Sequence, residues 1–336
     1  MDLKNESKLL RLRNTFDKNY KITRLYANYL EKAPTFISRD MIDELCSDGA
    51  LDIKSAITAL VCEIIGLDFE NPLDRELMRD YVAPSVRILD SRRYTEDAYY
   101  KNVKIQNKTV GSWEFRREAY PAFRAVICDD LAVTKDFTEI PPLGFFTEDF
   151  EFPAVLEGGN EWMTLTPIDM DTCRHAIEAA RGRVATFGLG LGYYAYHAAR
   201  KREVESVTVI ERSIEVIKLF TEQILPQMEC RDKIKIVCDD AFDYAKRVMP
   251  KENFDLAFVD IWRDGGDGAV AYKKMKPLEA FSKNTEFLYW IESFILSRLR
   301  AERFEELWEA ARSGKLSFDT VNSELTDKLR LAGIND

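Results

Sequence analysis

Between Arg183 and Trp262 the chain alternates short apolar runs with segments of helical period. The apolar runs predict four strands, at 184–187, 207–210, 234–238 and 254–259, and the segments between them predict helices. Strands that are separated by helices pair in parallel through right-handed crossovers. This part of the chain therefore predicts an α/β fold with a doubly wound, mostly parallel sheet.

A glycine-rich turn follows the first predicted strand. Gly188, Gly190 and Gly192 have the spacing G-x-G-x-G and precede a helical segment that begins at Tyr193. Glycine lets the backbone approach a ligand closely, and the next helix presents free N–H groups at its start. Enzymes that bind dinucleotides use G-x-G-x-x-G, which requires a glycine at position 193. The spacing therefore favours a nucleotide ligand other than a dinucleotide.

Acidic residues stand where the other predicted strands end. Glu211 ends the second strand, Asp240 and Ala241 follow the third, and Asp260 follows the fourth. In open α/β sheets, ligands bind beyond the carboxyl ends of the strands. Glu211 is placed to accept hydrogen bonds from ribose hydroxyls, and Asp240-Ala241 to meet an adenine. We expect Asp260 to point to the same edge, as a catalytic base or as a carboxylate that only positions a loop or the cofactor.

These motifs, taken together, resemble the class I S-adenosylmethionine-dependent methyltransferases, whose sheet is Rossmann-like. The arrangement of a β-rich segment before the cofactor domain resembles the spermidine synthase branch of that superfamily, in particular its bacterial members. The resemblance covers residues 160–265 well and residues 95–160 in outline. It implies S-adenosyl-L-methionine as cofactor, with the three glycines along its methionine and ribose, Glu211 on both ribose hydroxyls and Asp240 on the adenine.

The sequence also departs from these relatives. The family often has an acidic residue two positions before its first glycine, where this chain has Thr186. Aminopropyl transferases carry an aspartate inside the glycine loop, where this chain has Leu189 and Leu191, and D-S-x-D-P after the fourth strand, where it reads Asp260–Asp264 as D-I-W-R-D. Polyamine synthesis is therefore disfavoured. The N-P-P-Y signature of methyltransferases that act on nucleobase amines is absent.

Three aromatic residues flank the predicted site. Trp162, Tyr193 and Trp262 are candidates for a substrate-binding wall, since a π face suits a cationic sulfonium, although ordinary packing explains each as well. The run Asp264–Gly268 lacks the spacing of an EF-hand and is interpreted as a turn rather than a metal loop. Only two histidines occur, and no C-x-x-C pair is present, so no metal site is expected.

The rest of the chain is predicted in four parts. Residues 1–94 read as a helical N-terminal region and 95–160 as a small β-rich domain, with a hairpin of 99–105 and 112–115 and an edge strand at 149–156 that contains Pro153. Residues 161–300 form the S-adenosylmethionine-binding Rossmann-like domain, and 301–336 a helical C-terminal extension. Apolar residues from Phe287 to Trp308 predict a helical face that packs in the core or in a homodimer. The tail from Ser313 is expected to pack on either domain or on a partner subunit.

The composition of the chain limits the classes of partner that the protein is expected to bind. The 336 residues carry a net charge of −10, which argues against a nucleic-acid binder because phosphate contacts need a basic face. No apolar run is long enough for a membrane span, and the polar start of the chain differs from a secretory signal. Six cysteines without such context indicate reduced thiols. A cytoplasmic enzyme with a small-molecule substrate is expected.

The sequence thus predicts S-adenosylmethionine-dependent methyl transfer to an acceptor that it does not identify. Two alternatives remain open. One is an aminopropyl or aminocarboxypropyl transferase on the same scaffold, and the other is a non-catalytic nucleotide-binding or assembly protein.

Overall fold

The computed structural model describes residues 3–313 of the chain, and the predicted packing of the tail lies almost wholly outside them. The chain divides into two compact units, each built from discontinuous segments. One unit takes in Met1–Leu89, Pro121–Glu148 and Ser293–Asp336, so far as these are described, and the other takes in Asp90–Tyr120 and Asp149–Glu292. No described helix has the length and apolar character needed to cross a bilayer.

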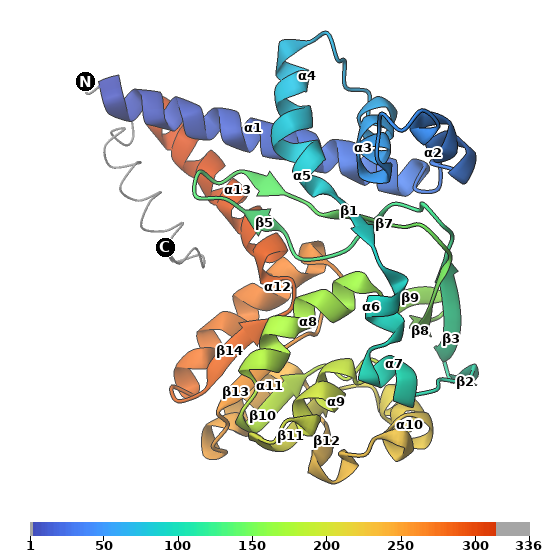
Figure 1. Cartoon of the computed structure of the whole chain (residues 1–336). Coiled ribbons are helices and arrows are strands. Elements are labelled where there is room, and N and C mark those ends of the chain that lie inside the picture. Colours follow the sequence, from blue (N-terminus) through green and yellow to red (C-terminus); the bar gives the residue numbers. More distant parts are fainter. Residues whose placement is uncertain (1–2, 314–336) are drawn as a thin grey trace. The chain divides into compact units, whose positions relative to one another are not determined.

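Helices make up most of the first unit (Figure 1). They are α1 (Leu3–Lys32), α2 (Arg39–Cys46), α3 (Ile53–Ile64), α4 (Pro72–Leu77), the π-helical η1 (Met78–Val82), α5 (Ala83–Ser85) and α13 (Glu292–Arg312). The predicted helical N-terminal region is confirmed for the described residues, although one strand, β1 (Val86–Leu89), lies within the range 1–94 that was predicted to be helical. Ser38, Asp52 and Asn71 cap three of these helices with their side chains. Pro84 lies in the first turn of α5, where a proline is tolerated.

Short strands complete the first unit. They are β1 (Val86–Leu89), β4 (Val126–Ile127), β5 (Ala132–Val133), β6 (Glu139–Ile140) and β7 (Leu143–Phe146). The order β1-β7-β4 forms one sheet, and β5 pairs with β6. Helix α13 is tied to this unit by a buried ion pair, in which Arg300 Nη2 lies 2.9 Å from Glu139 Oε1.

The second unit begins with two short helices and an antiparallel sheet. These are α6 (Ser91–Thr95), α7 (Ala98–Asn102), β2 (Lys108–Val110), β3 (Trp113–Tyr120), β8 (Phe150–Glu157) and β9 (Asn160–Thr164), with the strand order β2-β3-β8-β9. The β-rich reading is confirmed, but residues 99–102 are helical, so the hairpin prediction was wrong in its first strand. Asp97 accepts hydrogen bonds from the N–H groups of Tyr99 and Tyr100, and this cap starts a helix there.

The prediction that Pro153 marks an edge strand was wrong, because β8 pairs on both sides. A central position is tolerated for a local reason. The pairing of β8 with β9 ends at Ala154, and the Pro153 carbonyl accepts a hydrogen bond from the N–H of Leu165 just beyond it. The proline nitrogen faces the same side as its carbonyl, so the missing N–H removes no bond to β3.

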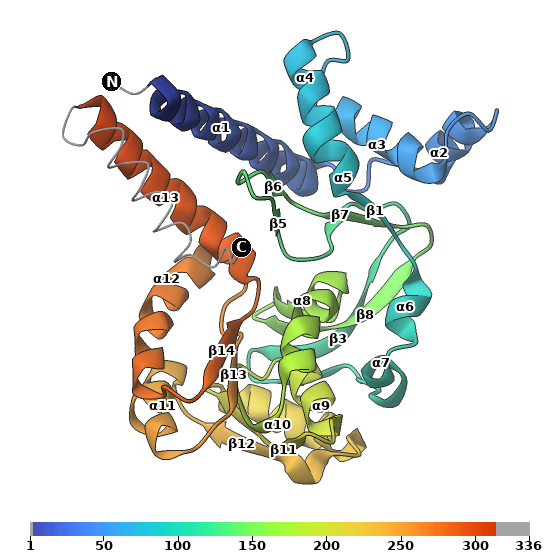
Figure 2. The same cartoon turned by 60° about the vertical axis from the view of Figure 1, so that its left-hand side comes forward.

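A parallel sheet of five strands forms the rest of this unit, with helices on both faces (Figure 2). Its strands are β10 (Gly182–Phe187), β11 (Val204–Glu211), β12 (Ile234–Cys238), β13 (Leu256–Val259) and β14 (Glu286–Tyr289). The helices are α8 (Pro167–Ala179), α9 (Tyr193–Arg200), α10 (Ile214–Gln223), α11 (Ala241–Arg247) and α12 (Gly265–Met275), with short 3-10 turns η2 (Leu225–Gln227), η3 (Arg231–Lys233), η4 (Met249–Lys251) and η5 (Lys276–Phe281).

The strand order is β12-β11-β10-β13-β14, and every neighbouring pair is parallel. The predicted α/β, Rossmann-like, doubly wound sheet is therefore confirmed. The chain proceeds outward from β10 to β12 and then returns to the other side of β10 with β13. The order of the strands reverses between β10 and β13, which is where ligands bind in sheets of this kind.

Candidate functional site at the carboxyl edge of the parallel sheet

The glycine turn joins β10 to α9 at the point where the strand order reverses. The φ angles of Gly188, Gly190 and Gly192 are +94°, +48° and +74°, a region that residues with a Cβ rarely adopt. The N–H of Gly192 donates to the carbonyl of Leu189 at 2.7 Å and closes the turn. The backbone conformation thus requires glycine at all three positions.

Packing inside the protein also requires glycine at two of these positions. A Cβ at 188 would meet the backbone carbonyl of Asp260, and a Cβ at 192 would meet the ring of Phe220. A Cβ at 190 would meet the sulfur of Met163. The first two neighbours are rigid, whereas a methionine side chain can change its rotamer. The flexible side of the turn therefore lies at Gly190.

The carboxylate of Glu211 holds the glycine turn from the neighbouring strand. Its Oε2 accepts a hydrogen bond from the Leu189 N–H at 3.1 Å, and its Oε1 accepts one from the Ser213 N–H at 2.8 Å. A carboxylate has about four acceptor positions, so these two bonds leave others for further donors. Glu211 is partly exposed at the end of β11. It can accept hydrogen bonds from two adjacent hydroxyl groups without releasing the turn.

Asp240 lies at the start of α11, after β12. Its Oδ1 accepts hydrogen bonds from the N–H groups of Phe242 and Asp243, at 2.9 and 3.0 Å, so that it caps the helix. Its other carboxylate oxygen makes no hydrogen bond with the described residues, and the side chain is exposed. Ala241, half-buried, begins the helix beside it. Helix capping thus occupies one carboxylate oxygen of Asp240, and the second can accept a hydrogen bond from a ligand.

Asp260 follows β13 and lies against the glycine turn through its backbone. Its N–H donates to the Phe187 carbonyl at 2.9 Å. Within residues 3–313, its carboxylate has no hydrogen-bond or ion-pair partner. Burial, and secondarily the nearby carboxyl of Asp169, raises the pKa of Asp260 well above its usual range. Once ionised, such a carboxylate is a stronger base than an exposed aspartate.

Asp169, which the sequence interpretation missed, is the carboxyl that interacts electrostatically with Asp260. It lies in the first turn of α8, and its Oδ2 accepts three hydrogen bonds of 2.8 to 2.9 Å, from the Thr166 N–H and from the hydroxyls of Thr164 and Thr166. Burial raises the pKa of Asp169 to about 6. The pattern T-P-x-D does indicate the start of a helix, but nothing in it indicates that Asp260 is near.

The three aromatic candidates have different surroundings. The Trp162 ring lies edge-on to that of Trp113, and the guanidinium of Arg263, in the loop after β13, lies 5.6 Å from its centre. Tyr193 is buried, with its hydroxyl 3.4 Å from Asp97. Trp262 is buried and stacks on Tyr289, and its indole N–H has no hydrogen-bond partner among the described residues. Their roles in substrate binding stay predictions.

Asp264 and Asp267, which follow Asp260, form a capping box at the start of α12. Asp264 accepts hydrogen bonds from the N–H groups of Gly266 and Asp267 and caps α12. In the part of the chain that the structure describes, no three His, Cys, Asp or Glu residues are grouped so that they could hold a metal.

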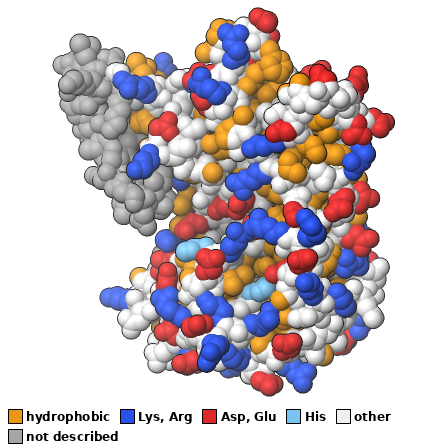
Figure 3. Space-filling view, viewed as in Figure 1, with side chains coloured by type: hydrophobic (Ala, Val, Ile, Leu, Met, Phe, Trp, Pro, Cys, Tyr) orange, Lys and Arg blue, Asp and Glu red, His pale blue; other side chains and the backbone are white. Residues whose placement is uncertain are grey.

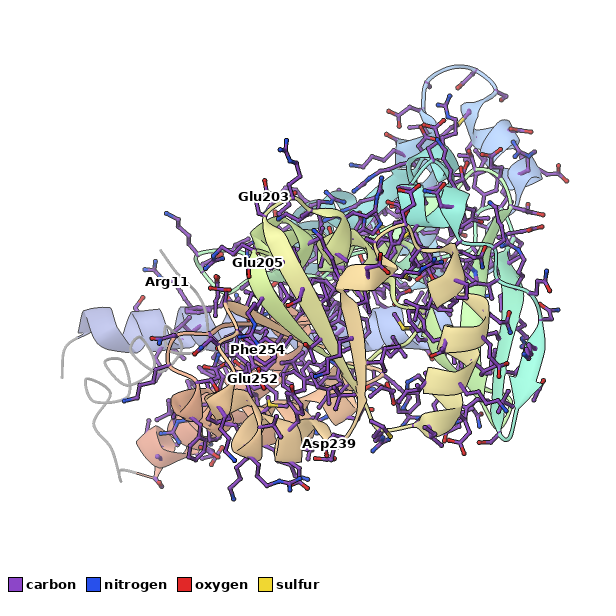
Figure 4. All side chains as sticks on the ribbon, turned by 90° about the horizontal axis from the view of Figure 1, so that it is seen from below. Arg11, Glu203, Glu205, Asp239, Glu252 and Phe254 are labelled. Atoms are coloured by element: carbon purple, nitrogen blue, oxygen red, sulfur yellow. The ribbon has the colours of Figure 1, made fainter. Side chains whose placement is uncertain are left out.

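Different side chains lie at the two ends of the parallel strands. Figure 4 shows Glu203 and Glu205 at the start of β11, and Glu252 and Phe254 before β13, away from Asp239, which follows β12. The side chains described above belong to the end marked by Asp239. Glu205 is therefore an exposed carboxylate on the same strand as Glu211 but at its opposite end.

Comparison with known proteins adds little to this description. No family model matches the chain, and no curated protein matches it. Among solved structures, it is similar to a crystal structure of MNMC2 from Aquifex aeolicus, at 17% identity, over 40% of this chain and 49% of that one, with a TM-score of 0.21. The chain thus spans about half the length of that protein. So low a score carries no information about activity.

Proposed function

We propose that the protein is an enzyme that binds S-adenosyl-L-methionine at the carboxyl edge of its parallel sheet and transfers the methyl group to a small molecule. The observation that carries this proposal is the position of Glu211. Its carboxylate holds the glycine turn through the Leu189 N–H and keeps acceptor positions for a pair of hydroxyl groups. The resemblance of the glycine spacing and of Asp240-Ala241 to class I methyltransferases supports the same cofactor.

The residues around the turn fit such a nucleoside. Asp240 keeps one free carboxylate oxygen, which suits the exocyclic amine of an adenine. The turn is covered at Gly190 by the flexible Met163 side chain, which can give way to a ligand. At Gly188 and Gly192 the neighbours are rigid, so the turn itself keeps its shape. Gly188, Gly190 and Gly192 would line the methionine and ribose portions.

Bound S-adenosylmethionine supplies a methyl carbon that is activated by its positively charged sulfur. The chain must then align the acceptor and accept its proton where the acceptor arrives protonated. Asp260 is the candidate base, because its carboxylate has no other partner in the described chain and its pKa is raised by burial. Trp162, Tyr193 and Trp262 are proposed for the acceptor side.

Titration calorimetry tests the cofactor, with S-adenosylmethionine and S-adenosylhomocysteine as ligands for the intact protein. We expect both to bind with one site per chain. Failure of both to bind at millimolar concentration contradicts the proposal and leaves the non-catalytic assembly protein as the better interpretation.

Product analysis then separates methyl transfer from the alternative transferases. The protein is incubated with S-adenosylmethionine and a mixture of small amines, alcohols and thiols. Formation of S-adenosylhomocysteine indicates methyl transfer. Formation of methylthioadenosine indicates transfer of an aminopropyl or aminocarboxypropyl group and contradicts the proposed reaction.

A further inference from the structure

A short helix outside the parallel sheet contacts the glycine turn directly. The hydroxyl of Tyr99, on α7, donates a hydrogen bond of 2.5 Å to the carbonyl of Leu191. The Tyr99 side chain is almost completely buried, and its ring lies edge-on to Tyr193 and Tyr196, with centres 5.6 and 5.4 Å away. A backbone carbonyl inside the turn is thus satisfied by a residue that lies about ninety positions earlier in the chain.

The rest of α7 is fixed to α9 by a network of polar contacts. Asp97, which caps α7, lies 3.1 Å from His197 Nε2 and 3.4 Å from the Tyr193 hydroxyl. Asn102, at the other end of α7, donates to the Tyr196 hydroxyl at 3.0 Å. Burial raises the pKa of the Asp97 carboxyl, but its interaction with His197 and its hydrogen bonds from the N–H groups of Tyr99 and Tyr100 together outweigh burial and keep that pKa below its usual range. Asp97 is therefore a charged, fixed anchor for the helix.

The bond from Tyr99 acts on the peptide that closes the turn. The carbonyl of Leu191 and the N–H of Gly192 belong to the same peptide plane. That N–H donates to Leu189, whose own N–H donates to Glu211. Fixing one side of the plane with the Tyr99 hydroxyl therefore fixes the direction of the other side.

We propose that Tyr99 is a positioning residue for the cofactor turn, in which its hydroxyl holds the Leu191–Gly192 peptide in the orientation that keeps Gly188–Gly192 ready for a ligand. The ligand part of this inference rests on the proposed function. The residue contacts the turn and not the reacting atoms, so its effect is on the shape of the turn and on cofactor affinity.

The neighbouring residue provides a matched control. Tyr100 lies on the same helix, and its hydroxyl also donates to a backbone carbonyl, that of Glu151 on β8. Tyr100→Phe and Tyr99→Phe therefore each remove one hydroxyl and one bond to a carbonyl, and Tyr100→Phe also removes a hydrogen bond of 3.1 Å from Arg117. Only Tyr99→Phe removes a bond to the glycine turn.

Two measurements on the full chain test the proposal. Hydrogen–deuterium exchange of peptides that contain residues 188–193 is measured without ligand, and the affinity for S-adenosylhomocysteine is measured by calorimetry. We expect Tyr99→Phe to raise exchange in the turn and to weaken binding about tenfold, which corresponds to one well-formed hydrogen bond. Tyr100→Phe is expected to change neither. Urea unfolding of both variants shows whether either loses stability throughout the molecule.

Unchanged exchange of the turn in Tyr99→Phe overturns the proposal, as does an equal change in both variants. The outcome also distinguishes this inference from the proposed function. If the unmodified protein fails to bind the ligand while Tyr99→Phe still loosens the turn, the methyltransferase proposal fails and the positioning role of Tyr99 stands.

Discussion

At Gly192 the backbone has a φ of +74°, and a side chain would run into the ring of Phe220. Gly158, in the turn between β8 and β9, has a φ of +57° with no atom within 4 Å of a would-be Cβ. The two glycines share the backbone constraint, and only Gly192 has the packing constraint. Comparison of the two positions therefore separates the conformational cost of a side chain from its steric cost.

We expect Gly158→Ala to lower the free energy of unfolding by about 1 kcal/mol, which is the cost of a left-handed residue. Gly192→Ala adds the overpacking of Phe220 and is expected to lower it by about 3 kcal/mol. Urea denaturation measures both values. Equal losses in the two variants would show that the ring of Phe220 moves aside freely and that packing does not require the glycine.

Single residues of the site differ in how well the sequence predicts them. The glycines and Glu211 could be placed because each is tied to the end of a strand by spacing along the chain. Asp169 and Tyr99 could not, because their importance depends on residues that are far away in sequence: Asp169 acts electrostatically on Asp260, and Tyr99 donates a hydrogen bond to Leu191. Spacing along the chain carries no information about such pairs.

Helix α8 shows how a carboxyl serves an element and a site at once. Asp169 accepts three hydrogen bonds at the start of the helix, and burial raises its pKa to about 6. The pKa of an aspartate in an unfolded chain is about 3.9. The folded protein therefore binds more protons than the unfolded chain between these values. The stability that this difference in proton binding at Asp169 gives the folded protein is fully present below about pH 4 and is lost as the pH rises through about 6.

At each pH, the unfolding free energy of the Asp169→Asn variant is subtracted from that of the native protein. We expect this difference to fall by up to about 3 kcal/mol between pH 4 and pH 7. The asparagine keeps a carbonyl oxygen that can accept the threonine bonds but has no proton to lose. Urea unfolding at the two pH values checks this. A difference that does not vary with pH would mean that Asp169 titrates as an ordinary exposed aspartate.

Secondary-structure elements, like single residues, differ in how well the sequence predicts them. The strands of the parallel sheet up to β13 could be predicted, since each is an apolar run between helical segments. Strand β14 was missed because Phe287, Leu288 and Trp290 also fit a helical face. A strand of four residues is too short for its period to separate it from a helix. Pairing with β13 decides the structure.

At the scale of the whole molecule, the chain forms its units from segments that are not consecutive. Helix α13 packs against α1, with the rings of Phe16 and Phe304 stacked at 4.4 Å. The sequence divides linearly into a helical region, a β-rich domain, a cofactor domain and an extension, and that division stays a prediction. Packing between the two ends of a chain has no local signal.

The chain carries a net charge of −10. Acidic and basic side chains are interspersed on the face shown in Figure 3. Several acidic residues bind other groups of the protein. Asp97 and Asp240 cap helices, and Glu139 forms a buried ion pair with Arg300. The charge therefore contributes to the site through a few carboxylates, among them Glu211 and Asp260.

We propose that the carboxyl edge of the parallel sheet binds S-adenosylmethionine through Glu211. Calorimetry of Glu211→Ala and Glu205→Ala with S-adenosylhomocysteine tests this role, because the two carboxylates lie at opposite ends of the same strand. We expect Glu211→Ala to weaken binding by about 1.5–3 kcal/mol, the range of charge-assisted hydrogen bonds, and Glu205→Ala to leave it unchanged. Equal affinity of both variants for the ligand would show that Glu211 does not bind the cofactor.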